Sequence, residues 1–239
     1  MWRWLVVGMM VLFAPSVLAG APAPCPHPYF PMGEGLKLLY RAGKSEIAVS
    51  FSDVRSSSVE QRAVLHMSHK GRDGTAVATC SADGIRTEFG GLEGAVLSLS
   101  GLDMKVVSSE GIALPPPEQL FPGARWANTL SLEMRPPSGS KFAFGVVKTK
   151  FRKESSVEGI ERVQVAGRSW NALRVRNRIT AIGGTNGERT VESVTWIAPG
   201  AGVLRVKTGE SVDFELIRID RSPAAKGAAA TPVGRGGSR

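Results

Sequence analysis

The sequence is poor in the residues that most often carry catalysis or bind metal ions. Its 239 residues include three histidines and two cysteines. His66 and His69 would converge on a helix but point to opposite faces of a strand, and no third metal ligand is evident. No serine lies in a Gly-x-Ser-x-Gly elbow, and no glycine-rich phosphate loop precedes a helix. We therefore expect no metal, no cofactor and no enzymatic activity; a hydrolase whose residues meet only in space is a third alternative.

Long apolar runs are also absent after residue 18. A membrane-spanning helix needs about 20 apolar residues, and no later segment approaches that length. At the start, Arg3 precedes a short apolar stretch that ends in small residues, which is typical of a secretory signal peptide. We predict a signal peptide at 1–19, cleaved after Ala19, and a periplasmic or secreted protein. An uncleaved anchor is the alternative, and a lipoprotein is disfavoured because Pro24 precedes Cys25.

Acidic residues are fewer than basic ones, 21 against 30, which gives a net charge of +9. The segment 221–239 contains four basic residues and no acidic one, and Val233 is its only large apolar residue. We predict that this basic tail is disordered. The remaining chain has no nucleic-acid-binding motif. We therefore expect no nucleic acid as a partner, and at most weak contact with an anionic membrane surface.

The two cysteines, Cys25 and Cys80, both follow the predicted cleavage site. Export would place them in a compartment where disulfides form. We predict a Cys25–Cys80 bridge, which in the chain-entropy model is worth roughly 4 kcal/mol for a loop of this size. Two separate thiols are the alternative.

Short β-prone runs separated by turn residues fill the middle of the chain. Five prolines and three glycines at 20–35 predict an extended lead-in. Strands are predicted at 36–41, 46–54, 60–69, 75–81, 85–89, 95–99 and 104–108, and at 126–134, 141–151, 161–165, 170–182, 188–197, 202–208 and 212–219. A proline-rich connector at 114–123 separates the two series. The pattern predicts a mainly β protein with one antiparallel domain at 36–220 and little helix.

Turn pairs set the expected registers of the hairpins. Asp73-Gly74 and Asp83-Gly84 are typical of tight turns. A two-residue turn at Asn186-Gly187 would set Ile179 opposite Val194 and bring Trp196 onto the same apolar face. In the last hairpin, Lys207 would face Asp213, and Arg205 would face Glu215.

Three arginines alternate along the predicted strand at 170–182. Because side chains alternate between the two faces of a strand, Arg174, Arg176 and Arg178 share the face opposite to the apolar one. This face would meet either solvent or a protein partner.

Three stretches resemble the TapB-like family of small exported bacterial β proteins. The stretches are YFPMGEG at 29–35, VAGRSWNALRV at 165–175 and VTWIAPGAGVLRV at 194–206. The resemblance implies a single, strongly curved antiparallel sheet, an open or half barrel similar to the lipoprotein-localisation factors. It implies no enzyme and no particular ligand.

The expected curved sheet motivates two non-enzymatic functions. In the first, an apolar small molecule or lipid-like chain binds on the concave face, through Leu39, Ile179, Val194 and Trp196. In the second, the protein is a structural or adaptor protein of the cell envelope and binds a protein partner through Arg174, Arg176 and Arg178. An open or a filled concave face would distinguish the two.

Overall fold

The computed structural model describes residues 27–97, 99, 103–135, 145–183 and 187–222. Twelve strands form one antiparallel sheet in the order β5-β4-β3-β2-β1-β12-β11-β10-β9-β8-β7-β6. The predicted mainly β fold, a single curved antiparallel sheet, is confirmed. The strands are β1 (Leu36–Ala42), β2 (Ser45–Ser56), β3 (Glu60–His69), β4 (Arg72–Ser81), β5 (Gly84–Thr87), β6 (Asp103–Gly111), β7 (Arg125–Arg135), β8 (Val147–Val165), β9 (Arg168–Ile182), β10 (Arg189–Ala198), β11 (Gly202–Thr208) and β12 (Ser211–Arg221).

The two edge strands, β5 and β6, lie close together because the sheet curves back on itself. An isolated bridge joins Ile85 to Leu114, just after β6. The Ile85 N–H donates to the Leu114 carbonyl at 2.8 Å, and the Ala113 N–H donates to the Ile85 carbonyl at 2.8 Å. Gly84 allows this approach, because a Cβ at this position would lie 2.4 Å from the Leu114 carbonyl oxygen. The sheet is therefore nearly closed and barrel-like, with one short seam.

A helix, α1 (Leu92–Leu97), stands where the sequence predicted a strand at 95–99. Leu92 and Ala95 are buried in the main core cluster, and their spacing of three residues is helical rather than alternating. Gly94 is required in this turn, because a Cβ would lie 2.0 Å from the Phe89 carbonyl oxygen. The strand prediction was wrong because only one turn and a half of helical pattern is present.

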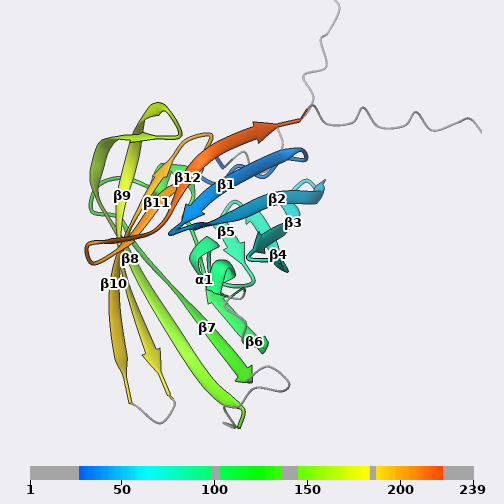
Figure 1. Ribbon diagram of the computed structural model, residues 1–239, viewed down its shortest axis with the longest axis vertical. Coiled ribbons are helices and arrows are strands. Elements are labelled where there is room, and N and C mark those ends of the chain that lie inside the picture. The colour runs from blue at the N-terminus through cyan, green and yellow to red at the C-terminus, as the bar shows by residue number, and fades with distance from the viewer. Residues whose placement is uncertain (1–26, 98, 100–102, 136–144, 184–186, 223–239) are drawn as a thin grey trace, which may run out of the picture.

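The long strands β7–β10 run down one side of the molecule, with α1 on the inner side of their curve (Figure 1). β8 has 19 residues. It joins the part of the predicted strand at 141–151 that the structure describes with the one at 161–165, because Val157–Gly159 forms a bulge rather than a break. The wall made by these strands is therefore longer than the sequence pattern indicated.

The core has two clusters. The larger one fills the space inside β1–β3 and β10–β12, with Tyr40, Ile47, Leu204 and Leu216 almost fully buried. The smaller one packs Ile85 and other side chains beneath the connector at 112–124. Phe30 of the lead-in packs against both clusters. The lead-in thus covers one end of the curved sheet.

The register between β9 and β10 differs from the predicted one. Ile179 pairs with Val191, three residues away from the expected Val194. β9 ends at Ile182 and β10 begins at Arg189, and Asn186 of the predicted turn lies outside the described residues. Because the shift is odd, it moves Val194 and Trp196 to the face opposite to Ile179.

The last hairpin keeps half of its predicted register. Arg205 pairs with Glu215 as expected. A bulge after Val206 then places Lys207 opposite Val212. Asp213 instead accepts a hydrogen bond from the Thr208 hydroxyl at 2.6 Å.

The turn predicted at Asp73-Gly74 lies elsewhere. Lys70 and Gly71 have positive φ values of 50° and 72° and connect β3 to β4. Asp73 and Gly74 lie within β4, opposite Ser68 and Met67. The glycine that accepts the left-handed conformation is therefore Gly71 rather than Gly74.

Several predictions concern residues outside the described ranges: the signal peptide at 1–19, the lead-in up to residue 26, Cys25, and the tail from 223 onward. Cys80 is fully buried in β4 and belongs to the smaller core cluster. Because Cys25 is not among the described residues, the Cys25–Cys80 bridge stays a prediction.

His27 attaches the described start of the lead-in to the connector. Its side chain is buried, and its Nε2 lies 2.8 Å from the Pro115 carbonyl oxygen, which requires a proton on Nε2. Its Nδ1 is buried without a hydrogen-bond partner among the described residues. Burial lowers the pKa of His27, and the Pro115 hydrogen bond and Glu118 oppose this only in part.

We therefore expect the lead-in to loosen in mild acid. A lowered pKa in the folded protein means that the contribution of His27 to stability is complete above the ordinary value of 6.5. It is lost as the pH falls from that value through the pKa of the folded state. The measurement is the free energy of unfolding against pH for the wild type and His27→Gln, whose amide can still donate to Pro115. The difference between the two proteins should change as the pH falls below 6.5; a constant difference would contradict the expectation.

Candidate functional site

An open groove lies between the segment around α1 and the concave face of β7–β9. Its cavity volume is about 210 Å³. The lining is mostly apolar, and the residues are Phe89, Gly90, Glu93, Gly94, Asn128, Leu130, Phe151, Lys153 and Ile179. We call this cavity the groove.

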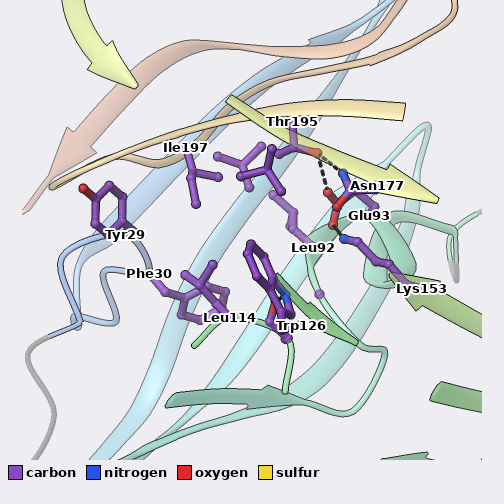
Figure 2. Close-up of a pocket in the computed structure, with 14 residues that line it drawn as sticks. Tyr29, Phe30, Leu92, Glu93, Leu114, Trp126, Lys153, Asn177, Thr195 and Ile197 are labelled. Carbon is purple, nitrogen blue, oxygen red and sulfur yellow. Dashed lines mark hydrogen bonds and ion pairs between the residues drawn. The ribbon is translucent and has the colours of Figure 1, made fainter. Parts of the chain in front are cut away.

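A second, smaller cavity adjoins the groove, and we call it the chamber. Figure 2 shows Tyr29, Phe30, Leu114, Trp126 and Ile197 around it. Its volume is about 50 Å³. One water molecule needs about 10–15 Å³ of such space, so the chamber has room for a few waters.

Glu93 and Lys153 line both cavities and separate them. The Lys153 ammonium lies 3.2 Å from Glu93 Oε2, and the two side chains are 16% and 19% exposed. The Thr195 hydroxyl donates to Glu93 Oε1 at 2.9 Å. Asn177 Nδ2 in turn donates to the Thr195 Oγ1 at 2.9 Å, and the Ser155 hydroxyl donates to Asn177 Oδ1 at 2.8 Å. These five residues form the polar cluster. Figure 2 shows all of them except Ser155.

The polar cluster holds its carboxylate in the charged form. Burial by itself would raise the pKa of Glu93. The charge of Lys153, the Glu93 backbone N–H and the hydrogen bonds from Thr195 and Lys153 together outweigh burial and leave the pKa below its ordinary value. Glu93 and Lys153 are therefore an ion pair at neutral pH, with no net charge between them.

The four residues predicted to line an apolar site do not share one surface. Ile179 lines the groove. Leu39 is buried in β1 and belongs to neither core cluster. Val194 and Trp196 lie on the other face of β10 from Thr195 and Ile197, which line the chamber. Of the four, only Ile179 lies at the groove.

The arginine face carries ion pairs within the chain. Arg174 pairs with Glu158 and lies 3.7 Å from Glu161, and Arg176 pairs with Glu158 at 2.5 Å. For Arg178, the described residues provide no ion pair. The predicted role of Arg174, Arg176 and Arg178 in partner binding stays a prediction, and two of the three charges are already balanced.

Trp196 stands at the centre of that face. Its Nε1–H donates to Glu161 at 2.9 Å. The guanidinium groups of Arg174 and Arg205 lie 5.9 Å and 5.8 Å from its ring centroid. With 7% of its surface exposed, Trp196 is a packing residue here.

One serine–histidine contact bears on the hydrolase alternative. The Ser52 hydroxyl lies 2.7 Å from His66 Nε2. The nearby Asp53 accepts from Ser52 itself, at 3.5 Å, and so does not orient the imidazole as a triad carboxylate would. None of the three lines the groove or the chamber. In the parts of the chain that the structure describes, no group of three or more potential ligands could hold a metal ion.

Glu93 and Lys153 were not predicted as site residues. Lys153 ends a basic run in which Lys148, Lys150 and Arg152 share one face, and the period of two sends Lys153 to the other face with Phe151. This alternation could have been used to predict that Lys153 lies on the apolar face of the strand. No sequence pattern indicated Glu93 as a site residue, because it lies in a segment predicted to precede a strand.

The fold and the two cavities define a class: a mainly β protein with one nearly closed antiparallel sheet and a small helix beside its concave wall. Among solved structures, the chain is similar to a protein from Bacteroides fragilis described as exported and as having a YmcC-like fold. The TM-score is 0.58 at 15% identity, over 81% of this chain and 99% of the other. At this identity the likeness shows a shared fold.

Two further solved structures are similar at lower scores. A protein from Parabacteroides distasonis whose description proposes a lipoprotein gives a TM-score of 0.43 at 12% identity, over 80% of this chain and 98% of the other. The hypothetical lipoprotein YmcC from Escherichia coli gives 0.41 at 12% identity, over 78% and 88%. No family model and no curated protein matches the chain. The resemblance to the TapB-like family stays a prediction.

None of the helices in the described part of the chain combines the length and the apolar character that crossing a membrane as a helix would require.

Proposed function

We propose that the protein is an exported, non-enzymatic binding protein that holds an apolar chain in the groove. The observation that carries the proposal is the apolar groove of about 210 Å³ on the concave side of the sheet. Pockets for drug-sized ligands measure about 300–1,000 Å³. The groove is therefore suited to a single narrow chain rather than to a bulky ring system.

The chemistry of the lining supports a hydrocarbon chain. Leu130 and Phe151 are neighbours across β7 and β8, and Ile179 lies on the adjacent strand. Burying apolar surface contributes about 25 cal/mol per Å², so a chain along these side chains would be held without any specific polar contact.

Two observations support an extracytoplasmic location. Residues 1–19 have the pattern of a signal peptide. The solved structure with the same fold is described as an exported protein. A protein outside the inner membrane that binds one acyl chain could carry or sense a lipid there.

The alternatives have less support. Docking of a partner on the arginine face would have to break ion pairs that Arg174 and Arg176 already make. A hydrolase would need a carboxylate beside His66, and the contact made by Asp53 is with Ser52.

The test places a charge in the groove. Ile179→Arg is expected to weaken chain binding at least tenfold, because the arginine fills the groove and must be desolvated whenever a chain enters. Binding is measured by saturable Nile red fluorescence on the purified mature protein, together with mass spectrometry of lipids extracted from it.

Ile160→Arg is the matched control, because Ile160 is 67% exposed on β8 and does not line the groove. Its affinity should equal that of the wild type. Circular dichroism and thermal unfolding check that both variants fold. If the wild type yields no bound lipid and no saturable dye binding, the proposal is wrong.

A further inference from the structure

The Lys153 ammonium has hydrogen-bonding capacity that the described residues leave unused. A lysine ammonium has three N–H donors. Within the described residues, Lys153 makes one hydrogen bond, to Glu93 Oε2 at 3.2 Å. Two donors remain at the junction of the groove and the chamber, where the side chain is only 16% exposed.

The other groups of the polar cluster are satisfied. Glu93 accepts from Thr195 through Oε1 and from Lys153 through Oε2. Asn177 accepts from Ser155 and donates to Thr195. A ligand that reaches the cluster therefore meets spare donors, and these belong to Lys153.

Charge balance decides what kind of acceptor fits. Lys153 and Glu93 neutralise one another, so a bound carboxylate or phosphate would leave a net negative charge in a poorly solvated site, which is costly. An uncharged acceptor gains a charge-assisted hydrogen bond and adds no net charge.

The position of Lys153 relative to the apolar lining fixes where a chain would run. Lys153 pairs with Ile179 across β8 and β9, and Phe151 is the next residue on the same face of β8. An acceptor at the ammonium therefore has the apolar side chains of the groove directly beside it.

We infer that the ligand of the groove is an acyl chain with an uncharged carbonyl head, an ester or an amide, whose carbonyl oxygen accepts a hydrogen bond from Lys153. This inference rests on the proposed function, because it names the ligand class of the same groove. Ester and amide share the required carbonyl oxygen, and the experiment distinguishes them.

The experiment compares four probes of matched chain length by displacement of Nile red: methyl laurate, its N-methyl amide, laurate, and an alkane of equal length. The wild type should bind the better of the two carbonyl probes about tenfold or more tightly than the alkane, and more tightly than laurate. The double variant Glu93→Gln/Lys153→Met removes both charges together. It should keep the affinity for the alkane and lose the preference for the carbonyl.

Lys150→Met is the matched control, because Lys150 is exposed and lies on the other face of β8. It should keep the preference. A preference that survives in the double variant, or tighter binding of laurate than of both carbonyl probes, would overturn the inference while chain binding stands. Failure of all four probes on the wild type would instead overturn the proposed function.

A measurement on the wild type alone keeps the inference testable if the double variant does not fold. The infrared stretching band of an isotope-labelled ester carbonyl should move to lower frequency in the complex, relative to the same ester in hydrocarbon solvent. An unshifted band would show that Lys153 does not contact the carbonyl.

Discussion

Replacing Lys153 with Met is expected to lower the free energy of unfolding by about 3 kcal/mol at neutral pH. The substitution keeps the apolar stem and removes the ammonium 3.2 Å from Glu93 Oε2. Glu93 would then be a carboxylate without a cation in an enclosed site. Breaking a fully buried pair costs about 3–5 kcal/mol, and the residual exposure of both side chains places this value at the lower end.

The pH dependence of stability shows whether the loss in Lys153→Met comes from the unpaired charge of Glu93. In the wild type the pKa of Glu93 is lowered, so its stabilising contribution is present above the ordinary carboxylate range and is lost as the pH falls. In Lys153→Met, burial acts without the lysine and raises the pKa of Glu93. Stability due to this group should then be highest in acid and decline as the pH rises through the raised pKa.

Urea unfolding at a series of pH values measures both effects. The double variant Glu93→Gln/Lys153→Met should recover most of the stability, because it leaves no unpaired charge, and Lys150→Met should resemble the wild type. Equal losses in the single and double variants, with the same pH slope, would mean that lost packing rather than the ion pair is responsible.

Replacing Trp196 with Ala is expected to cost about 3–5 kcal/mol of stability and to leave chain binding unchanged. Trp196 is 7% exposed, belongs to the larger core cluster, and lies between Arg174 and Arg205. Removing the ring opens a cavity and leaves the hydrogen bond to Glu161 unmade.

Thermal and urea unfolding measure the loss of stability, and Nile red titration of the folded fraction measures binding. Trp196→Phe is the control: it retains most of the apolar area, loses the Nε1 donor, and should cost about 1 kcal/mol. A selective loss of chain binding in Trp196→Ala, with little loss of stability, would contradict this expectation. It would instead support the sequence-based prediction that Trp196 contacts the ligand.

Alternation and turn residues predicted a mainly β, antiparallel protein, because both signals are local, whereas the single curved sheet was implied by the family resemblance. The strand predicted at 60–69 is β3 without change, and that at 202–208 is β11. The helix α1 was missed because its buried pair, Leu92 and Ala95, is too short a pattern to distinguish a helix from a strand. Its position depends on packing against the core, which no local pattern reports.

The site was less predictable than the fold, because it depends on register and on distant contacts. A shift of three residues between β9 and β10 was enough to place Val194 and Trp196 on the wrong face. The polar cluster joins Glu93 to Lys153 and Thr195 across 60 and 102 residues of sequence. A single sequence carries no signal for such pairs.

The position of β1 beside β12 has a consequence for how the protein folds. These strands pair residues 36–41 with residues 215–221, so the middle of the sheet joins the first and last parts of the described domain. Contacts between such distant segments form late, because most of the chain must be ordered to bring them together. The sheet cannot be completed until synthesis has passed Arg221. Until then the strands β1–β5 and the strands β6–β11 lack the strand that joins them in the sheet.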